Sequence, residues 1–217
     1  TLPSDTLAII GVPTYAGRVA PTALERLQQI KGDNTPAIIV VLYGNRDYED
    51  ALLELRNTAK QLGFVPIAGG AFIGEHSYST EEFPTAAGRP DVSDIQIAAE
   101  FGKNIIKQLY QYTDIKKLPV LDVKGNFPYK ENKPRTPATP ITIDELCTQC
   151  QYCIEICPVE TIELKEEIVS DPEVCIKCCA CVKECPNGAR GFNTPFSEFL
   201  FKNFHDRKEP ELFDLTR

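Results

Sequence analysis

The sequence predicts an α/β fold in two parts, a parallel sheet covered by helices and then a small α+β unit that is rich in cysteine. Two observations carry this prediction. Short apolar runs alternate with helix-like segments over residues 1–113, and residues 147–158 match residues 175–186 at a period of 28. Apolar strands that alternate with helices are typical of parallel sheets covered on both faces. An internal repeat indicates a second, duplicated unit.

Three strands and three helices are predicted in the first part. Continuous apolar runs, which suit buried strands, cover residues 7–12, 37–43 and 64–73. Apolar residues at helical spacing predict helices over residues 21–31, 48–62 and 92–112. Pro21 suits the first turn of its helix, and Gly32 follows that helix as a stop signal. The alternation predicts repeated β-α units and therefore a parallel sheet.

The rest of the chain differs in composition from the first part. Pro and Lys become frequent after Thr113, which is typical of an extended linker, and the cysteines follow. We expect an amphipathic helix in the tail that docks on one of the two domains. Its apolar residues at near-helical spacing are Phe196, Phe199, Leu200 and Phe204. The expected segments are residues 1–113 (α/β domain), 114–140 (Pro-rich linker), 141–193 (cysteine-rich domain) and 194–217 (tail).

Charge and composition exclude several classes of partner. The formal net charge of −8 argues against nucleic acid, because phosphates are bound largely by Lys and Arg. No run of about 18 apolar residues could span a bilayer. All nine cysteines lie between Cys147 and Cys185, unlike the disulfide framework of a small secreted protein. We therefore expect a soluble protein of the cytoplasm.

The cysteines form two copies of the motif C-x2-C-x2-C-x3-C-P. The copies are Cys147, Cys150, Cys153, Cys157 with Pro158, and Cys175, Cys178, Cys181, Cys185 with Pro186. Three thiolates at this spacing on a tight loop can converge on three iron corners of one cubane cluster. Structural zinc and disulfides are the alternatives, since paired C-x2-C motifs commonly bind zinc, but two full copies of the longer motif favour clusters. Cys179 is out of register with both copies and is expected to pack as a small buried residue.

Residues 141–192 resemble the bacterial two-cluster ferredoxins, which carry this motif twice and pass single electrons. The resemblance implies two [4Fe-4S] clusters, in which the fourth cysteine of each run binds the cluster of the other run. Cluster I would be held by Cys147, Cys150, Cys153 and Cys185. Cluster II would be held by Cys175, Cys178, Cys181 and Cys157. The chain departs from the family at Gln151 and Cys179, where Gly is usual, which concerns loop geometry and not the ligands.

Three loops after the predicted strands carry aromatic and small or polar residues, at the edge where parallel sheets bind ligands. They cover residues 13–18, 43–48 and 74–79. Residues 11–15 and 43–48 resemble the flavodoxin loops that enclose the flavin ring of FMN, and the resemblance extends over about residues 5–113. It implies FMN contacts from Thr14, Tyr15, Ala16, Gly17, Tyr43, Gly44, Asn45 and Tyr48. The alternative is a covering of the sheet edge by Tyr15, Tyr43, Tyr48 and Tyr78.

Taken whole, the chain is similar to the flavodoxin-ferredoxin fusion proteins of anaerobic bacteria. It departs from flavodoxins in lacking the Ser/Thr-Gly-Thr-rich loop that holds the FMN phosphate, together with two strands, one of them central. This departure places the first residue about 45 residues into the family pattern. We expect the flavodoxin-like sheet to be incomplete in this chain, and the natural protein to be longer or a separate segment to complete the sheet.

These features predict an electron-transfer protein that links FMN to two [4Fe-4S] clusters and exchanges electrons with a soluble redox protein. Acidic residues outnumber basic ones in residues 141–193, which implies a basic docking face on the partner. They are Asp144, Glu145, Glu155, Glu160, Glu163, Glu166, Glu167, Asp171, Glu173 and Glu184. One alternative is an oxidoreductase that uses Arg18, Glu75 and His76, and another is a sensor whose clusters report oxygen or iron. No hydrolytic triad is apparent.

Overall fold

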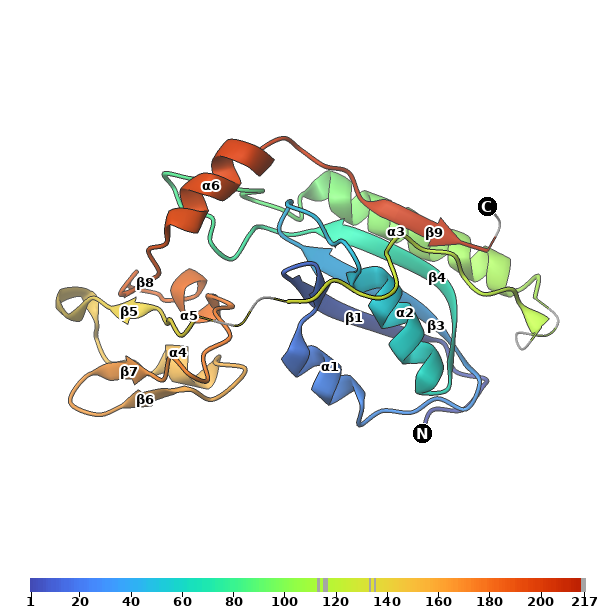
Figure 1. Ribbon diagram of the computed structural model, residues 1–217, viewed down its shortest axis with the longest axis horizontal. Coiled ribbons are helices and arrows are strands. Elements are labelled where there is room, and N and C mark those ends of the chain that lie inside the picture. The colour runs from blue at the N-terminus through green and yellow to red at the C-terminus, as the bar shows by residue number, and fades with distance from the viewer. Residues whose placement is uncertain (113, 115–116, 133, 135, 216–217) are drawn as a thin grey trace. The chain divides into compact units, whose positions relative to one another are not determined.

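The computed structural model describes residues 1–112, 114, 117–132, 134 and 136–215. These residues form two compact units, whose elements are labelled in Figure 1. Unit 1 consists of residues 1–75 and 206–215 and the described residues between 86 and 132. Unit 2 consists of residues 76–85 and the described residues between 134 and 205. The expected boundary at Thr113 and the last two residues of the expected tail lie outside the described residues.

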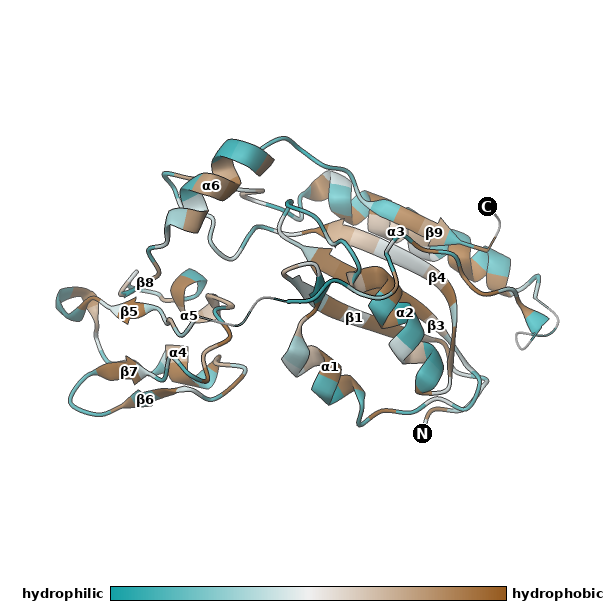
Figure 2. Ribbon diagram, viewed as in Figure 1, coloured by the Kyte–Doolittle hydropathy of each residue, from teal (hydrophilic) through white to brown (hydrophobic). Residues whose placement is uncertain are grey.

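Unit 1 is built on a five-stranded mixed sheet with the strand order β2-β1-β3-β4-β9. Its strands are β1 (Ala8–Tyr15), β2 (Arg18–Val19), β3 (Thr35–Tyr43), β4 (Phe64–Ile73) and β9 (Glu211–Asp214). The three central strands β1, β3 and β4 are parallel, and the two edge strands are antiparallel to their neighbours. Apolar residues concentrate in the central strands (Figure 2). A mainly parallel α/β sheet is therefore confirmed, with edges that the sequence did not predict.

Helices pack against both faces of this sheet. They are α1 (Pro21–Leu27), α2 (Ala51–Gln61) and α3 (Val92–Leu109), and none of the described helices is both long and apolar enough to span a membrane. Alternate residues of β3 enter different cores, because successive side chains of a strand point to opposite faces. Ile39 packs with Leu52 and Leu55 of α2, whereas Ile38 packs with Phe101 and Ile105 of α3.

The C-terminal segment contributes both a helix and a strand. Helix α6 (Pro195–Phe204) belongs to unit 2, and β9 then pairs with β4, opposite Gly69 and Gly70. Leu212 and Phe213 of β9 pack into the cores on opposite faces of the sheet. The tail is thus helical only over Pro195–Phe204, and Glu211–Asp214 form an edge strand of the sheet in unit 1.

Part of the segment expected as a linker is packed on unit 1. Leu121 is 1% exposed and belongs to the core between the sheet and α2, together with Val123. The carboxylate of Asp50 accepts hydrogen bonds from the backbone N–H groups of Asn126 (2.8 Å) and Lys130 (2.7 Å). These contacts fix the segment beside the N-terminus of α2.

Unit 2 contains two small antiparallel sheets and short helices that repeat in two halves. The sheets pair β5 (Ile141–Thr142) with β8 (Arg190–Gly191), and β6 (Ile162–Leu164) with β7 (Ile168–Ser170). The helices are α4 (Tyr152–Glu155), α5 (Ala180–Lys183), α6 and the 3-10 turn η2 (Asp144–Leu146). The start of α5 follows that of α4 by 28 residues, the period of the cysteine motif.

Candidate metal centre

The two cysteine loops have the same backbone conformation. Each loop has positive φ at three positions, and the two sets are 28 residues apart. The pairs are Gln149 (53°) and Lys177 (56°), Gln151 (63°) and Cys179 (57°), and Glu160 (50°) and Gly188 (60°). Helices α4 and α5 each begin directly after a left-handed residue. Gln151 and Cys179 therefore keep the left-handed backbone conformation, although they stand where Gly is usual. This conformation is uncommon for residues other than Gly.

All nine thiols are free, and the third cysteine of each run is buried. Cys153 is 9% and Cys181 is 7% exposed, and both belong to one apolar core with Ile162 and Ile168. Cys150, in contrast, is exposed to solvent. In the part of the chain that the structure describes, no three His, Cys, Asp or Glu side chains are grouped as a site for a single metal ion.

One cavity of unit 2 is lined by five cysteines, four of which belong to the two runs. Its wall includes Cys175, Cys178 and Cys181 of the second run together with Cys157, the last cysteine of the first run. Burial raises the pKa of the Cys178 thiol, and the neighbouring Cys157 and Cys175 raise it further. The remaining wall is mainly apolar. The cavity wall thus contains the four thiols expected for cluster II together with the thiol of Cys179.

Thiols of both runs also lie close to one another in the set expected for cluster I. Burial raises the pKa of the Cys153 thiol, and Cys150 and Cys185 are close enough to add to this effect. Cys185 belongs to the second run, so each run places its last cysteine near the thiols of the other. Cys147 lines a separate, open hollow with Asp144, Glu166 and Glu167. Since Cys150 is exposed, this side of unit 2 is more accessible than the cavity around Cys178.

Backbone N–H groups point at several of the sulfurs. Thr161 N–H donates to Cys157 Sγ (3.5 Å), and Ala189 N–H donates to Cys185 Sγ (3.3 Å), again 28 residues apart. Hydrogen bonds to sulfur and an apolar surrounding are among the factors that set the potentials of iron-sulfur clusters. Two [4Fe-4S] clusters fit the cysteine thiols of the two runs, the N–H groups that donate to them and the mainly apolar cavity.

A loop that the sequence placed with unit 1 covers this region of unit 2. Residues 76–85 belong to unit 2, where the ring of Tyr78 lies 5.2 Å from that of Phe192. Burial, followed by the nearby thiols of Cys179, Cys175 and Cys178, raises the pKa of Tyr78 to about 12. Lys183 Nζ donates to the carbonyl oxygen of Ser79 (2.7 Å). Sequence reasoning missed this role, since the loop directly follows the predicted third strand.

The first expected flavin loop is a tight hairpin. Thr14 and Tyr15 lie at the end of β1, and Ala16 (φ 52°) and Gly17 (φ 85°) form the two-residue turn into β2. Positive φ at both turn residues is typical of the type I′ hairpin turn. A Cβ at Gly17 would overlap the side chain of Glu49, including its Cβ, so space also favours glycine at this position.

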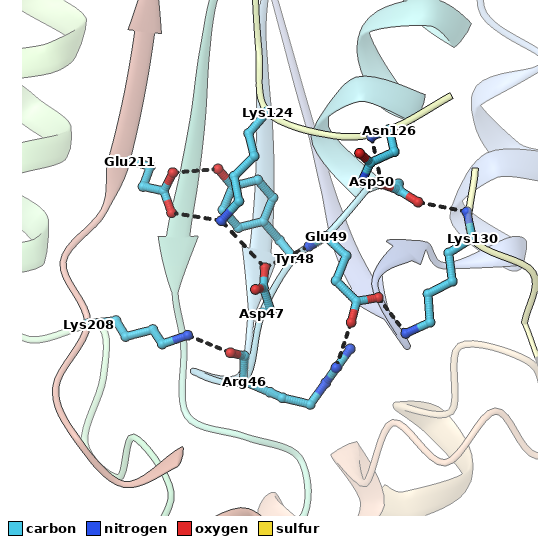
Figure 3. Close-up of polar contacts among 10 residues, drawn as sticks. All are labelled: Arg46, Asp47, Tyr48, Glu49, Asp50, Lys124, Asn126, Lys130, Lys208 and Glu211. Carbon is cyan, nitrogen blue, oxygen red and sulfur yellow. Dashed lines mark hydrogen bonds and ion pairs between the residues drawn. The ribbon is translucent and has the colours of Figure 1, made fainter. Parts of the chain in front are cut away.

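The second expected flavin loop is held by side chains of its own unit (Figure 3). Tyr48 is 1% and Tyr43 is 5% exposed, and their rings pack 5.4 Å apart. The Tyr48 hydroxyl donates to Glu211 (2.8 Å), and Lys124 Nζ lies 4.7 Å from the centre of the Tyr48 ring. Burial, followed by the hydrogen bond to Glu211, raises the pKa of Tyr48. Both tyrosines thus close this edge of the sheet.

The remaining residues of this loop also have structural contacts. Gly44 follows β3 and is half-buried. Asn45, which is 1% exposed, donates through Nδ2 to the carbonyl oxygen of Asp206 (2.8 Å). Lys208 Nζ donates to the carbonyl oxygen of Arg46 (2.5 Å). The loop is thereby joined to the segment that leads into β9.

The residues expected for an oxidoreductase are occupied by other contacts. The guanidinium of Arg18 binds the carboxylate of Glu54 (2.5 and 2.8 Å). Glu75 accepts a hydrogen bond from Gly88 N–H (3.2 Å). His76 belongs to unit 2, where its Nδ1 accepts from Tyr78 N–H (3.0 Å). Each of these side chains therefore has a contact within its own unit.

Comparison with known protein families identifies the cysteine-rich region. Residues 139–189 match the model of the 4Fe-4S dicluster domain. No curated protein matches the chain. The match includes both cysteine runs, from Cys147 to Cys185, and residues 139–189 are therefore an iron-sulfur domain of the ferredoxin type.

Proposed function

We propose that this chain, which carries a ferredoxin-type 4Fe-4S dicluster domain over residues 139–189, transfers electrons through two [4Fe-4S] clusters. Cluster I is held by Cys147, Cys150, Cys153 and Cys185, and cluster II by Cys175, Cys178, Cys181 and Cys157. The cavity that joins Cys157 to three cysteines of the second run carries the proposal. When bound, such clusters supply one-electron chemistry, and the protein supplies position, shielding and tuning.

The two sets of thiols differ in their exposure to solvent. The thiols of Cys175 and Cys181 are buried, whereas Cys150 is exposed and Cys147 borders an acidic hollow. Asp144, Glu166 and Glu167 line that hollow. We infer that a soluble redox partner docks at the cluster I side through a basic surface, since complementary charge steers association. This docking should weaken as salt is added.

The first test is metal analysis of protein purified without oxygen. We expect about eight irons and eight sulfides per chain, and electron paramagnetic resonance signals of two clusters after reduction. Zinc, or disulfides in place of iron and sulfide, would overturn the proposal. Cys179→Ser is the matched control, because Cys179 is buried but lies outside both sets, and it should keep the full iron content.

Two double variants test the exchange of ligands between the runs. Cys157→Ser with Cys178→Ser removes two ligands of cluster II, so about four irons should remain per chain. Cys153→Ser with Cys157→Ser removes one ligand from each cluster and should lose nearly all iron. If each run held its own cluster, the order of the two iron contents would be reversed, and that result would contradict the assignment.

Flavin binding to unit 1 stays a prediction of the flavodoxin resemblance, and we leave it outside the proposal. Tyr43 and Tyr48 offer no exposed ring face, because both are buried. Four of the expected contacts are accessible to solvent: Ala16 is exposed, and Thr14, Tyr15 and Gly44 are half-buried. Stoichiometric FMN in the purified chain, measured by its absorbance after release, would extend the proposal to flavin chemistry.

A further inference from the structure

Arg190 is a buried arginine at the centre of unit 2. It lies in β8 and is 3% exposed. Its Nη1 donates to Thr142 Oγ1 in β5 (2.7 Å), and its Nη2 donates to Ser170 Oγ in β7 (2.6 Å). Nη2 also lies 3.9 Å from Cys181 Sγ, and the buried Nε has no hydrogen-bond partner among the residues that the structure describes. The guanidinium thus contacts two hydroxyl groups and one thiol.

The charge of Arg190 has no protein counter-ion among the described residues. No described carboxylate forms an ion pair with it. Guanidinium stays protonated in proteins, and a buried charge without a partner is costly. The chain provides a carboxylate for another buried arginine, since Arg89 is paired with Asp94. Hydroxyl groups of Thr142 and Ser170 satisfy hydrogen bonds but supply no negative charge.

The groups around Arg190 that can carry negative charge are the cysteine thiols. Cys181 Sγ lies 3.9 Å from Arg190 Nη2, and Cys153 packs in the same small buried core as Cys181. Cys153 belongs to the set of cluster I and Cys181 to the set of cluster II. The charge of Arg190 therefore acts on one buried ligand of each cluster, with direct contact on the cluster II side.

We propose that Arg190 is a shared internal counter-charge for the two clusters and raises the reduction potentials of both, cluster II more than cluster I. This inference rests on the proposed function. A cubane with four thiolates is a net anion that becomes more negative on reduction, so a fixed cation stabilises the reduced form more than the oxidised form. Burial excludes the water and salt that would screen the charge. Arg190 would thus be a tuning residue and not a ligand.

Replacement of Arg190 separates charge from hydrogen bonding. Arg190→Gln removes the charge, Arg190→Lys keeps it, and Thr142→Val with Ser170→Ala keeps the arginine but removes its hydroxyl partners. Lys165→Gln is the matched control, because it removes one positive charge from the same unit at a side chain that is 63% exposed. Each full-length variant is reconstituted without oxygen, its iron is counted, and both potentials are measured by titration followed with electron paramagnetic resonance.

We expect Arg190→Gln to lower the one-electron reduction constant of cluster II at least tenfold, which is about 59 mV. Cluster I should shift in the same direction by less, and the other three variants should each change either constant by less than about threefold, or about 28 mV. Full iron with unchanged potentials in Arg190→Gln would overturn the inference and leave the proposed function intact. Wild-type protein without iron would overturn the proposed function and the inference with it.

If Arg190→Gln loses its clusters, its potentials have no value to compare, and Arg190→Lys then tests the inference. Full iron and near wild-type potentials in the lysine variant would then support a requirement for charge at this position. Failure of both variants to assemble clusters, or lowered potentials in Arg190→Lys, would overturn the inference, because the fork of hydrogen bonds and not the charge would be the essential feature.

Discussion

At the scale of single residues, Arg89 and Asp94 show how unit 1 holds a buried charge. Both side chains are at most 5% exposed, and Arg89 Nε donates to Asp94 Oδ2 (2.8 Å). Asp94 also accepts from Asp91 N–H at the start of α3 (2.8 Å). Arg89 Nη1 donates to the carbonyl oxygen of Lys208 before β9 (2.5 Å). One ion pair thus connects a helix start with the last strand of the sheet.

We predict that Asp94→Asn lowers the free energy of unfolding by about 3–5 kcal/mol at neutral pH, because it leaves a buried guanidinium unpaired. The hydrogen bond from Arg89 is the main cause that lowers the pKa of Asp94. The ion pair therefore stabilises unit 1 fully above the ordinary carboxyl pKa of about 3.9. This stabilisation is lost as the pH falls through the lower pKa that Asp94 has in the folded protein.

The difference between Asp94→Asn and wild type should therefore narrow below about pH 4. Urea unfolding at several pH values, followed by circular dichroism, measures this difference. Glu100→Gln is the control on the same helix, because Glu100 pairs with Lys103 at the surface and should change stability little. An equal loss of stability in both variants would contradict the role of burial.

At the scale of elements, β9 is the part of unit 1 that comes from the far end of the chain. Leu212 and Phe213 enter the two cores from a strand that pairs with Gly69 and Gly70 of β4. The two glycines offer no side chains of their own, so neighbouring apolar groups cover this stretch of β4. Glu211 adds the hydrogen bond to Tyr48.

We predict that a chain ending at Pro210 loses about 2–4 kcal/mol of stability in unit 1, because it lacks the partly buried apolar side chains of Leu212, Phe213 and Leu215. It should also self-associate, because the edge of β4 becomes exposed. Glu211→Gln keeps the strand and is the control. Thermal unfolding and light scattering measure both effects, whereas the iron content should stay that of wild type. Unchanged melting and no association would show that β9 is dispensable.

At the scale of the whole molecule, the two units differ in what can stabilise them. Unit 1 has two apolar cores formed by the sheet and its helices. The core of unit 2 is small, and two of its four buried members, Cys153 and Cys181, are proposed cluster ligands. A unit of this size usually needs metal or disulfides in addition to its core. We therefore expect folding of unit 2 to depend on its clusters.

We predict that removal of iron unfolds unit 2 and leaves unit 1 folded. Hydrogen exchange measured by mass spectrometry should show lost protection in α4, α5 and β6–β7 after chelation without oxygen. Protection in β1, β3 and β4 should persist and serves as the internal control. Equal protection of unit 2 before and after iron removal would contradict this dependence.

Local sequence patterns predicted most central elements of this chain. The strand over residues 64–73 has the predicted bounds, and α3 starts at the predicted Val92. The period of 28 recurs in the backbone conformation of the cysteine loops. These features depend on apolar spacing, helix caps and motif spacing, which act over a few residues and are therefore visible in the sequence itself.

Tertiary structure alone decided the features that join distant segments. No local sequence pattern indicates three of these features. They are the pairing of β9 with β4, the inclusion of residues 76–85 in unit 2 and the burial of Tyr48. The same holds for Arg190, whose environment is formed by Thr142, Ser170 and Cys181. The sequence by itself determined most of the central strands and helices and the spacing of the thiols, because those depend on neighbouring residues. Long-range packing decides which surfaces are covered. Its favourable free energy is gained only after distant segments of the chain have been brought together.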